Sequence, residues 1–282
     1  MTQSKSWLDE RKWMGDEMKY FESEIFGKIR EPENFYELME LITIEMNQVG
    51  CNVKFWRGQG DIRWPIHSGA YRRLENSGNS EIRESDIKNY EKSLLLRASH
   101  RGLDFLEGKK LSDFELLARL QHHGAATRLV DFSKNCLIAL WFCITSNPDK
   151  TGLLIGIHSS FVGGNEGKIW GEIKKDYSSF IGNITNYNHP FVIEPPVVSP
   201  RIAAQHAVFL YSEITSESTG SLKIPTGKDK SLFIAISPKL KKIMRQILIE
   251  SFDIRTETIL PDLDGFAISN SYKVNTSDMW RW

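Results

Sequence analysis

The sequence predicts an α+β fold with a helical N-terminal half and a mixed, mainly antiparallel β core. Apolar residues recur at helical spacing through much of the first half of the chain. From Gly152 onward, short runs rich in β-branched and aromatic residues alternate with turn residues. Helices and strands do not alternate regularly, as they would in a doubly wound sheet.

The first half contains several helix signals. Ser112 and Glu115 have the spacing of a capping box, in which each side chain accepts a hydrogen bond from the backbone amide of the other residue. The segment Leu137–Thr145 is apolar on all sides and should be buried, with Ser133 or Asn135 as its N-cap. We expect three further helices in this half: Glu33–Asn47, Asp86–His100, and Ser112 to His122 or His123.

The second half is expected to consist mainly of strands. The predicted strands of the whole chain are Val53–Trp56, Gly152–His158, Phe191–Glu194, Val208–Tyr211, Ser231–Ile236 and Thr256–Leu260. One clear helix interrupts them, with Ser237 as its N-cap and Pro238 in its first turn. A last short helix should begin near Pro261.

The composition is that of a globular protein. The chain has 282 residues, of which 40% are hydrophobic and 26% charged. The 36 basic side chains equal the 36 acidic ones, which argues against a protein that coats nucleic acid by bulk electrostatics. We expect residues 1–32 to form a helical extension and residues 33–282 to form one domain.

The environment expected for the chain is the cytoplasm, without membrane association. The three cysteines, Cys51, Cys136 and Cys143, lack paired metal-ligand spacing and are expected to be reduced and buried. The first ten residues contain no apolar core typical of a signal peptide. The apolar run Cys136–Ile144 is too short to span a bilayer.

Three stretches could carry chemistry. In the first, Phe55–Gly60, Arg57 ends a short apolar strand and is followed by two glycines that would let a ligand approach the backbone, an arrangement that suits a bound anion. The second, Leu120–Cys143, places several polar side chains just before a helix N-terminus. Its two adjacent histidines, His122 and His123, point about 100° apart on a helix and are poor partners for one metal ion. We therefore expect no metal site.

The third stretch, Val197–Ser212, has Arg201, Gln205 and His206 just before an apolar strand. Each of the three stretches also has an ordinary structural interpretation, in which its polar residues form turns, caps or ion pairs. Their occurrence together is what favours a shared site.

The chain resembles the FRG domain family, named after its Phe-x-Arg-Gly motif, here Phe55–Gly58. A second motif of the family resembles Gln121–Asp131, and a third is similar to Pro200–Phe209. The segment Thr256–Ala267 also resembles the end of the family's sequences. The four motifs occur in the family's order.

A looser resemblance in layout links the chain to ADP-ribosyltransferases, which transfer ADP-ribose from NAD. The resemblance implies that their fold occurs here, with an Arg-Gly strand that holds NAD. It implies catalytic roles for Arg57, Asp131 and Gln205. The residues it implies in NAD binding are Arg57, Gly58, Gln59, Thr127, Arg128 and Ser133.

The favoured hypothesis is a mono-ADP-ribosyltransferase that uses NAD as substrate. It would act on nucleic acid, RNA above all, or on protein, as a bacterial toxin of a toxin–antitoxin or anti-phage system. An antitoxin or chaperone would then be its partner.

Two other hypotheses remain open. The first is a nucleotide- or RNA-binding module without turnover, in which aromatic and basic side chains stack on bases and bind phosphates. The residues that would do so are Trp56, Trp64, Tyr71, Arg72 and Arg73. The second is a nuclease, with or without metal, that uses Asp131 with His122 or His123.

Overall fold

The computed structural model describes residues 18–47, 53–79, 81–163, 176–182, 184, 187–194, 199–227 and 230–272. Within these residues one sheet has eight strands: β1 (Tyr20–Ser23), β2 (Gly27–Arg30), β3 (Val53–Gln59), β6 (Val130–Ser133), β7 (Gly152–His158), β8 (Phe191–Ile193), β9 (Ala207–Tyr211) and β10 (Ser231–Ile236). Their order across the sheet is β1-β2-β10-β7-β3-β6-β9-β8. Only β2 and β10 pair in parallel among these strands, so the α+β class and the mainly antiparallel core are confirmed.

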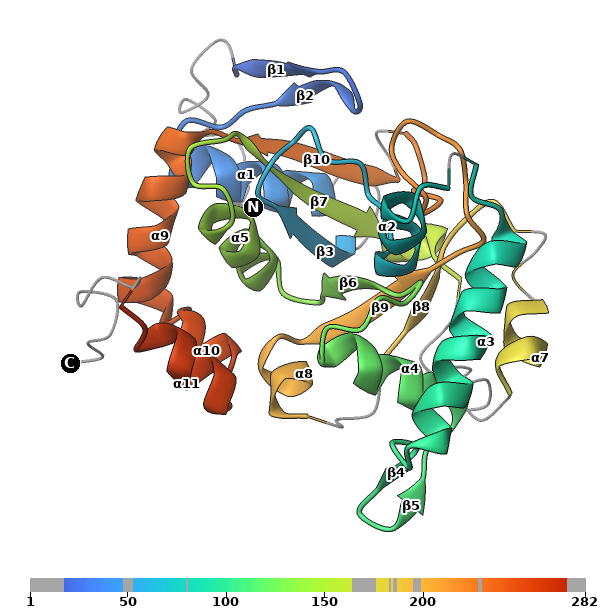
Figure 1. Ribbon diagram of the computed structural model, residues 1–282. Coiled ribbons are helices and arrows are strands. Elements are labelled where there is room, and N and C mark those ends of the chain that lie inside the picture. Colours follow the sequence, from blue (N-terminus) through green and yellow to red (C-terminus); the bar gives the residue numbers. More distant parts are fainter. Residues whose placement is uncertain are drawn as a thin grey trace, which may run out of the picture.

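Helices surround this sheet (Figure 1). They are α1 (Phe35–Asn47), α2 (Gly69–Asn76), α3 (Glu84–His100), α4 (Asp113–His122), α5 (Cys136–Thr145), α7 (Tyr177–Gly182), α8 (Pro200–Ala204), α9 (Pro238–Phe252), α10 (Thr256–Ile259) and α11 (Leu263–Ser269), with a short 3-10 helix at Ser159–Phe161. A small hairpin of β4 (Phe105–Leu106) and β5 (Lys109–Lys110) extends from the end of α3.

Most of the expected elements form where their local signals lie. The capping box at Ser112 and Glu115 is present, and Ser237 caps α9 with Pro238 in the first turn. Of the two candidate caps of α5, Asn135 takes the role: its Oδ1 accepts a hydrogen bond from the Leu137 amide at 2.9 Å. The short helices α2, α7 and α8 lack a long apolar repeat and were not expected.

Two expectations are wrong. We expected a helix over the first 32 residues, but Tyr20–Arg30 forms the β1–β2 hairpin. The turn uses local chemistry: Ser23 Oγ accepts from the Phe26 amide at 3.1 Å, and Gly27 adopts a φ of 70°. Residues 1–17, the rest of that expected extension, and Cys51 lie outside the described residues, as does the end of the expected domain, residues 273–282.

The predicted strand Thr256–Leu260 is instead the helix α10. Its β-branched residues favoured a strand, but Thr258 Oγ1 accepts a hydrogen bond from the Arg255 amide at 3.0 Å. This contact satisfies a donor at the start of the helix. Pro261 then follows the helix end, where it cannot continue the helical pattern.

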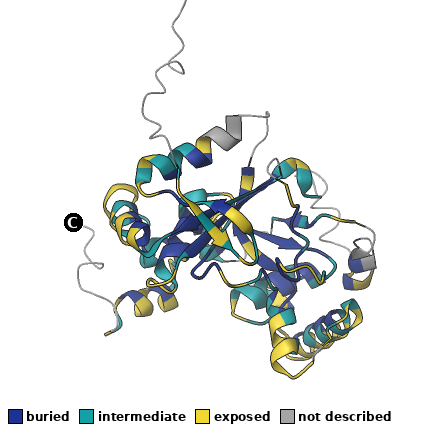
Figure 2. Ribbon diagram, turned by 90° about the horizontal axis from the view of Figure 1, so that it is seen from above, coloured by how far each residue is buried: buried dark blue, intermediate teal, exposed yellow. Residues whose placement is uncertain are grey.

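Two faces of the sheet are covered differently. Helices α1, α5 and α9 pack on the face that carries Trp56, Leu154 and Ile234. The opposite face carries Phe55 and Ile155 and packs mainly on loops, while α3, α4 and α7 cover the β8–β9 end. The central strands of the sheet are largely buried, and the helices present exposed outer faces (Figure 2).

Candidate functional site

The sheet is split between its two central strands. β3 and β6 are joined by a single residue pair, Trp56 with Ser133. Beyond that pair, Arg57–Gln59 keep their partners on β7, and Val130–Phe132 keep theirs on β9. The two halves of the sheet therefore separate where the first two sequence motifs end.

A cavity of about 720 Å³ opens at this split, and we call it the cleft. Its lining residues are Trp56, Arg57, Gly58, Gln59, Gly60, Trp64, Pro65, His67, Arg72, Glu75, Gln121, His122, Asp131, Phe132, Ser133, Ala139, Phe142, Ser146, Arg201, Ile202, Gln205, Ala207 and Phe209. Its volume lies within the range of pockets that hold small molecules and cofactors, which is about 300–1,000 Å³.

Arg57 spans the split. Its Nη1 donates to the backbone carbonyl of Asp131 at 2.8 Å, so one side chain replaces the missing pairing between β3 and β6. Its Nε donates to Oε1 of Gln59 at 3.4 Å. Burial lowers the pKa of Arg57, the nearby Asp131 carboxylate opposes this shift, and the positive charge of Arg72 adds to it.

Gln59 orients its neighbours. It is buried, and its Nε2 donates to the carbonyl of Trp64 at 2.9 Å while its Oε1 faces Arg57. The side chain thus links the guanidinium to the loop that follows β3, which fixes one wall of the cleft.

The glycines of the first motif serve helix packing. A Cβ on Gly58 would lie 1.9 Å from the Ala139 carbonyl oxygen of α5, and one on Gly60 would lie 2.4 Å from the Ser146 carbonyl oxygen. Both glycines were expected to let a ligand approach the backbone. The structure shows that they let α5 approach β3, although both also line the cleft.

Asp131 is held at the opposite side of the split. Its carboxylate is exposed, and Oδ2 accepts from Nε2 of Gln121 at 3.0 Å. Oε1 of the same glutamine accepts from Thr127 Oγ1 at 2.9 Å. Thr127 itself is fully buried behind this contact and does not line the cleft, so the structure does not place it where a cofactor would bind.

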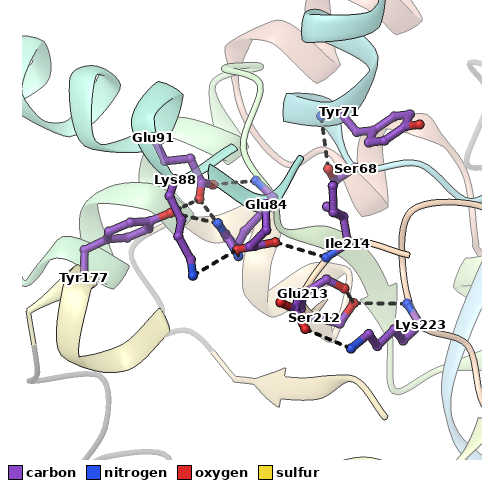
Figure 3. A network of polar contacts seen from close by, with 11 residues as sticks. Ser68, Tyr71, Glu84, Lys88, Glu91, Tyr177, Ser212, Glu213, Ile214 and Lys223 are labelled. Atoms are coloured by element: carbon purple, nitrogen blue, oxygen red, sulfur yellow. Dashed lines mark hydrogen bonds and ion pairs between the residues drawn. The ribbon is translucent and has the colours of Figure 1, made fainter. Parts of the chain in front are cut away.

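Arg128 is buried and does not line the cleft. Its partners Glu84, Glu91 and Tyr177 are labelled in Figure 3. Its Nε donates to Glu91 Oε2 at 2.6 Å, its Nη1 to Glu84 at 2.9 Å, and its Nη2 to the Tyr177 hydroxyl at 2.9 Å. Burial alone would lower the pKa of Arg128, but the Glu91 and Glu84 carboxylates outweigh it and raise that pKa. This arginine therefore joins α3, α7 and the start of β6 rather than a bound phosphate.

Ser133 and Gln205 connect the second motif to the third. Ser133 Oγ donates to the Gln205 carbonyl at 2.7 Å, and Gln205 Nε2 donates to the Ile259 carbonyl at 3.0 Å. Both residues line the cleft. The amide nitrogen of Gln205 therefore bonds α10, and among the described residues its Oε1 has no hydrogen-bond partner.

The remaining residues of the third motif differ in their positions. Arg201 lines the cleft, and it forms ion pairs with Asp262 and Asp264 that tie α8 to α11. His206 is exposed and does not line the cleft. His122 does line it: burial lowers its pKa, and the neighbouring His123 and Arg201 lower it further.

Four cleft residues lie outside the catalytic and NAD-binding sets that the resemblance implies, although Trp64 and Arg72 were expected to bind ligand in the binding-module alternative. Trp64 is 42% exposed, and Phe142 is 38% exposed on the otherwise buried α5. His67 lies in the loop before α2, and Arg72 belongs to α2. The signal that could have identified the two aromatic residues among them is an exposed aromatic ring: an apolar helix that leaves one large ring exposed in a cavity indicates a ligand-binding surface. Arg73 lies over the Tyr90 ring, 5.7 Å from its centroid, and outside the cleft.

The described part of the chain contains neither a metal-binding group nor a helix that could span a membrane. No group of three or more histidine, cysteine, aspartate and glutamate side chains is placed there to hold a metal ion. None of the helices in this part combines the length and apolar character needed to cross a bilayer.

Comparison with known proteins gives one result. The family model of the FRG domain matches residues 52–152, which run from the start of β3 to the start of β7 and include the first two motifs. No significant match was found among the curated proteins or among the solved structures. The chain therefore contains an FRG domain, over residues 52–152.

Proposed function

We propose that the protein is an NAD-dependent mono-ADP-ribosyltransferase whose active site is the cleft. The observation that carries this proposal is convergence. Arg57, Asp131 and Gln205 come from three motifs far apart in the sequence, and all three line one cavity where β3 and β6 separate. The cavity is large enough for a dinucleotide to enter at least in part, and it offers both cationic and aromatic surfaces.

The reaction breaks the bond between nicotinamide nitrogen and ribose C1. The electron pair leaves with nicotinamide, positive charge builds on the ribose, and the acceptor's oxygen or nitrogen then bonds to C1 and loses a proton. The Asp131 carboxylate is exposed in the cleft and held in place by Gln121, so it can stabilise the positive ribose. Arg57 would bind phosphate or ribose oxygens, and the free Oε1 of Gln205 would bond a ribose hydroxyl or the nucleophile.

The aromatic walls support a flat ligand. Trp64 follows β3 and Phe142 belongs to α5, and each leaves a large part of its ring exposed at the cleft. Nicotinamide and adenine are planar rings that stack well on such side chains. This feature supports a nucleotide more than a simple sugar or an inorganic anion.

The biological setting is part of the proposal. The acceptor would be nucleic acid, with RNA favoured, or protein, and the enzyme would act in the cytoplasm as a toxin of a toxin–antitoxin or anti-phage system. Such an enzyme needs an antitoxin or chaperone to be tolerated by its host. This setting is supported by the resemblance of the chain's layout to ADP-ribosyltransferases and by the order of its sequence motifs.

The test is release of nicotinamide from NAD by the purified protein, alone and with cellular RNA, DNA or protein added. We expect release to depend on one of these additions. Arg57→Ala should reduce it at least 100-fold, because the variant loses both a ligand contact and the link across the split. Arg57→Lys keeps the positive charge but not the planar guanidinium, which can bond two oxygens at once, so it should recover only part of the rate.

A control tests whether the effect is specific to the arginine in the cleft. Arg97→Ala removes an exposed arginine of α3 that bonds the Ser93 carbonyl of the same helix and does not line the cleft, so the rate of this variant should match that of the parent protein. No nicotinamide release by folded protein with any of the three additions would contradict the proposal.

One observation favours the alternative of binding without turnover. Gln205 occupies the position expected of a catalytic carboxylate, yet it is neutral and its amide is already bonded to Ile259. A binding module would bind nucleotide or RNA, lose affinity steeply with salt and yield no chemical product. Shortened RNA without NAD would instead indicate a nuclease.

A further inference from the structure

Within the described part of the chain, no carboxylate bonds the guanidinium groups of Arg57 and Arg72 in the cleft. Both side-chain hydrogen bonds of Arg57 go to neutral acceptors, the Asp131 carbonyl and Gln59 Oε1. Arg72 is exposed on α2 and lines the same cleft. Among the residues that the structure describes, its side chain has neither a hydrogen bond nor an ion pair.

The two arginines are close enough to repel each other. The positive charge of Arg72 contributes to lowering the pKa of Arg57, after the larger effect of burial. Placing like charges together in a partly desolvated cavity costs free energy, which an anion between them would offset. Guanidinium groups are well suited to such an anion, because their planar fork matches two phosphate oxygens at once.

His67 adds a neutral donor beside them. Its Nδ1 accepts a hydrogen bond from the Ser221 amide at 3.0 Å, so the neutral ring carries its proton on Nε2. The ring stacks on Tyr71, with centroids 4.3 Å apart and planes at 13°, which fixes its orientation. His67 lines the cleft, and no other described residue bonds its Nε2. Burial lowers the pKa of His67, with Glu75 opposing this effect and Arg72 adding to it.

We propose that Arg57, Arg72 and the Nε2–H of His67 form a phosphate-binding site for a nucleotide in the cleft. The site takes the place of the expected contact with Arg128, whose three side-chain nitrogens each donate to Glu84, Glu91 or Tyr177 instead. Naming the phosphate as part of NAD rests on the proposed function, whereas the site itself would serve any nucleotide that enters the cleft.

Two acidic side chains also line the cleft, and their negative charges predict in which direction nucleotide affinity changes when one of them is neutralised. The Asp131 carboxylate accepts from Gln121, and Glu75 lies one turn after Arg72 on α2. Glu75 forms no ion pair with Arg72 in the structure, but its charge opposes an incoming phosphate. Glu75→Gln should therefore bind the nucleotide a few-fold more tightly than the parent protein.

The experiment measures binding of ADP by calorimetry, with adenosine as the ligand that lacks phosphate. Arg72→Gln should weaken ADP binding about 10- to 100-fold, because a charged hydrogen-bond partner of the phosphate is lost. The affinity for adenosine should stay unchanged. Arg73→Gln is the matched control: it removes the same charge one residue later on α2, where the side chain lies over the Tyr90 ring and lines an adjoining pocket instead of the cleft. It should change ADP affinity less than twofold.

Two substitutions of His67 separate its donor from its structural bond. Asparagine can keep an acceptor for the Ser221 amide near the Nδ1 position but lacks a donor at Nε2, whereas the amide of glutamine reaches the Nε2 position. His67→Gln should retain most of the ADP affinity, and His67→Asn should lose about tenfold. A thermal melt of each variant verifies that it folds.

Equal effects of Arg72→Gln and Arg73→Gln would overturn the phosphate site, as would His67→Asn binding ADP at least as well as His67→Gln. These outcomes are independent of turnover. If ADP binding follows the expected pattern and NAD is never cleaved, the phosphate site stands and the transferase proposal fails. If NAD is cleaved but these variants bind ADP as well as the parent protein does, the transferase proposal stands and the phosphate site fails.

Discussion

At the scale of residues, most polar side chains of the three motifs are engaged within the protein. Thr127 bonds Gln121, Ser133 bonds the Gln205 carbonyl, and Arg128 bonds two glutamates and a tyrosine. A sequence shows that such residues cluster, but it does not show which of their donors and acceptors are already used. The structure leaves Asp131, Arg72 and His67 with groups that face the cleft.

The structural role of Arg128 leads to a test at this scale. Arg128→Met removes the guanidinium that pairs with the buried Glu91 carboxylate, which should lower the free energy of unfolding by about 3–5 kcal/mol. Chemical denaturation measures this loss. The ADP affinity of the folded fraction should stay within twofold of that of the parent protein.

A milder variant keeps this test usable if Arg128→Met fails to fold. Glu84 is the more exposed partner of Arg128, so Glu84→Gln should cost about 1–2 kcal/mol and again leave ADP affinity unchanged. A clear loss of ADP affinity with little loss of stability would instead return Arg128 to the ligand site.

At the scale of elements, the approach of α5 to β3 explains the Arg-Gly sequence. The glycines after Arg57 remove the side chains that would hold α5 away from the strand. Their position brings α5, with its exposed Phe142, to the edge of the cleft where β6 leaves β3. The Arg-Gly pair thus combines a cation on one face of the strand with close packing on the other.

Gly58→Ala tests this packing. The added Cβ would meet the Ala139 carbonyl oxygen at 1.9 Å, and since that oxygen is backbone, α5 must shift. We expect a loss of about 3 kcal/mol or more in the free energy of unfolding. Gly108→Ala is the comparison, because Gly108 has a φ of 80° and open space around it and should cost only about 1–2 kcal/mol.

If Gly58→Ala were no more destabilising than Gly108→Ala, the packing role of Gly58 would be wrong. A stable Gly58→Ala variant that had lost ADP affinity would show instead that this glycine makes room for ligand.

At the scale of the whole molecule, the α+β class and most elements could be predicted because their signals are local. The capping box at Ser112, the Ser237–Pro238 start of α9 and the apolar run of α5 are read from a few neighbouring residues. The hairpin Tyr20–Arg30 and the helix Thr256–Ile259 were missed because turn and capping contacts outweighed the residues' average preferences.

The cleft could be predicted only in part. The motifs named Arg57, Asp131 and Gln205, and these do meet. The split between β3 and β6 depends on pairing between strands that lie far apart in the chain, so no local pattern reveals it. His67 and Phe142 reach the cleft through the same long-range arrangement, and no sequence motif assigned them to the site. Trp64 and Arg72 were named only for the alternative of a binding module.

The measurement that tests the central claim most directly is hydrogen–deuterium exchange of the protein with and without NAD. If the dinucleotide binds in the cleft, amides should gain protection in the segments that meet at the split: 57–60, 64–72, 121–133 and 199–207. Peptides of α3 and of the β4–β5 hairpin, outside the cleft, should exchange as before. Protection confined to other segments, or none at saturating NAD, would contradict the account.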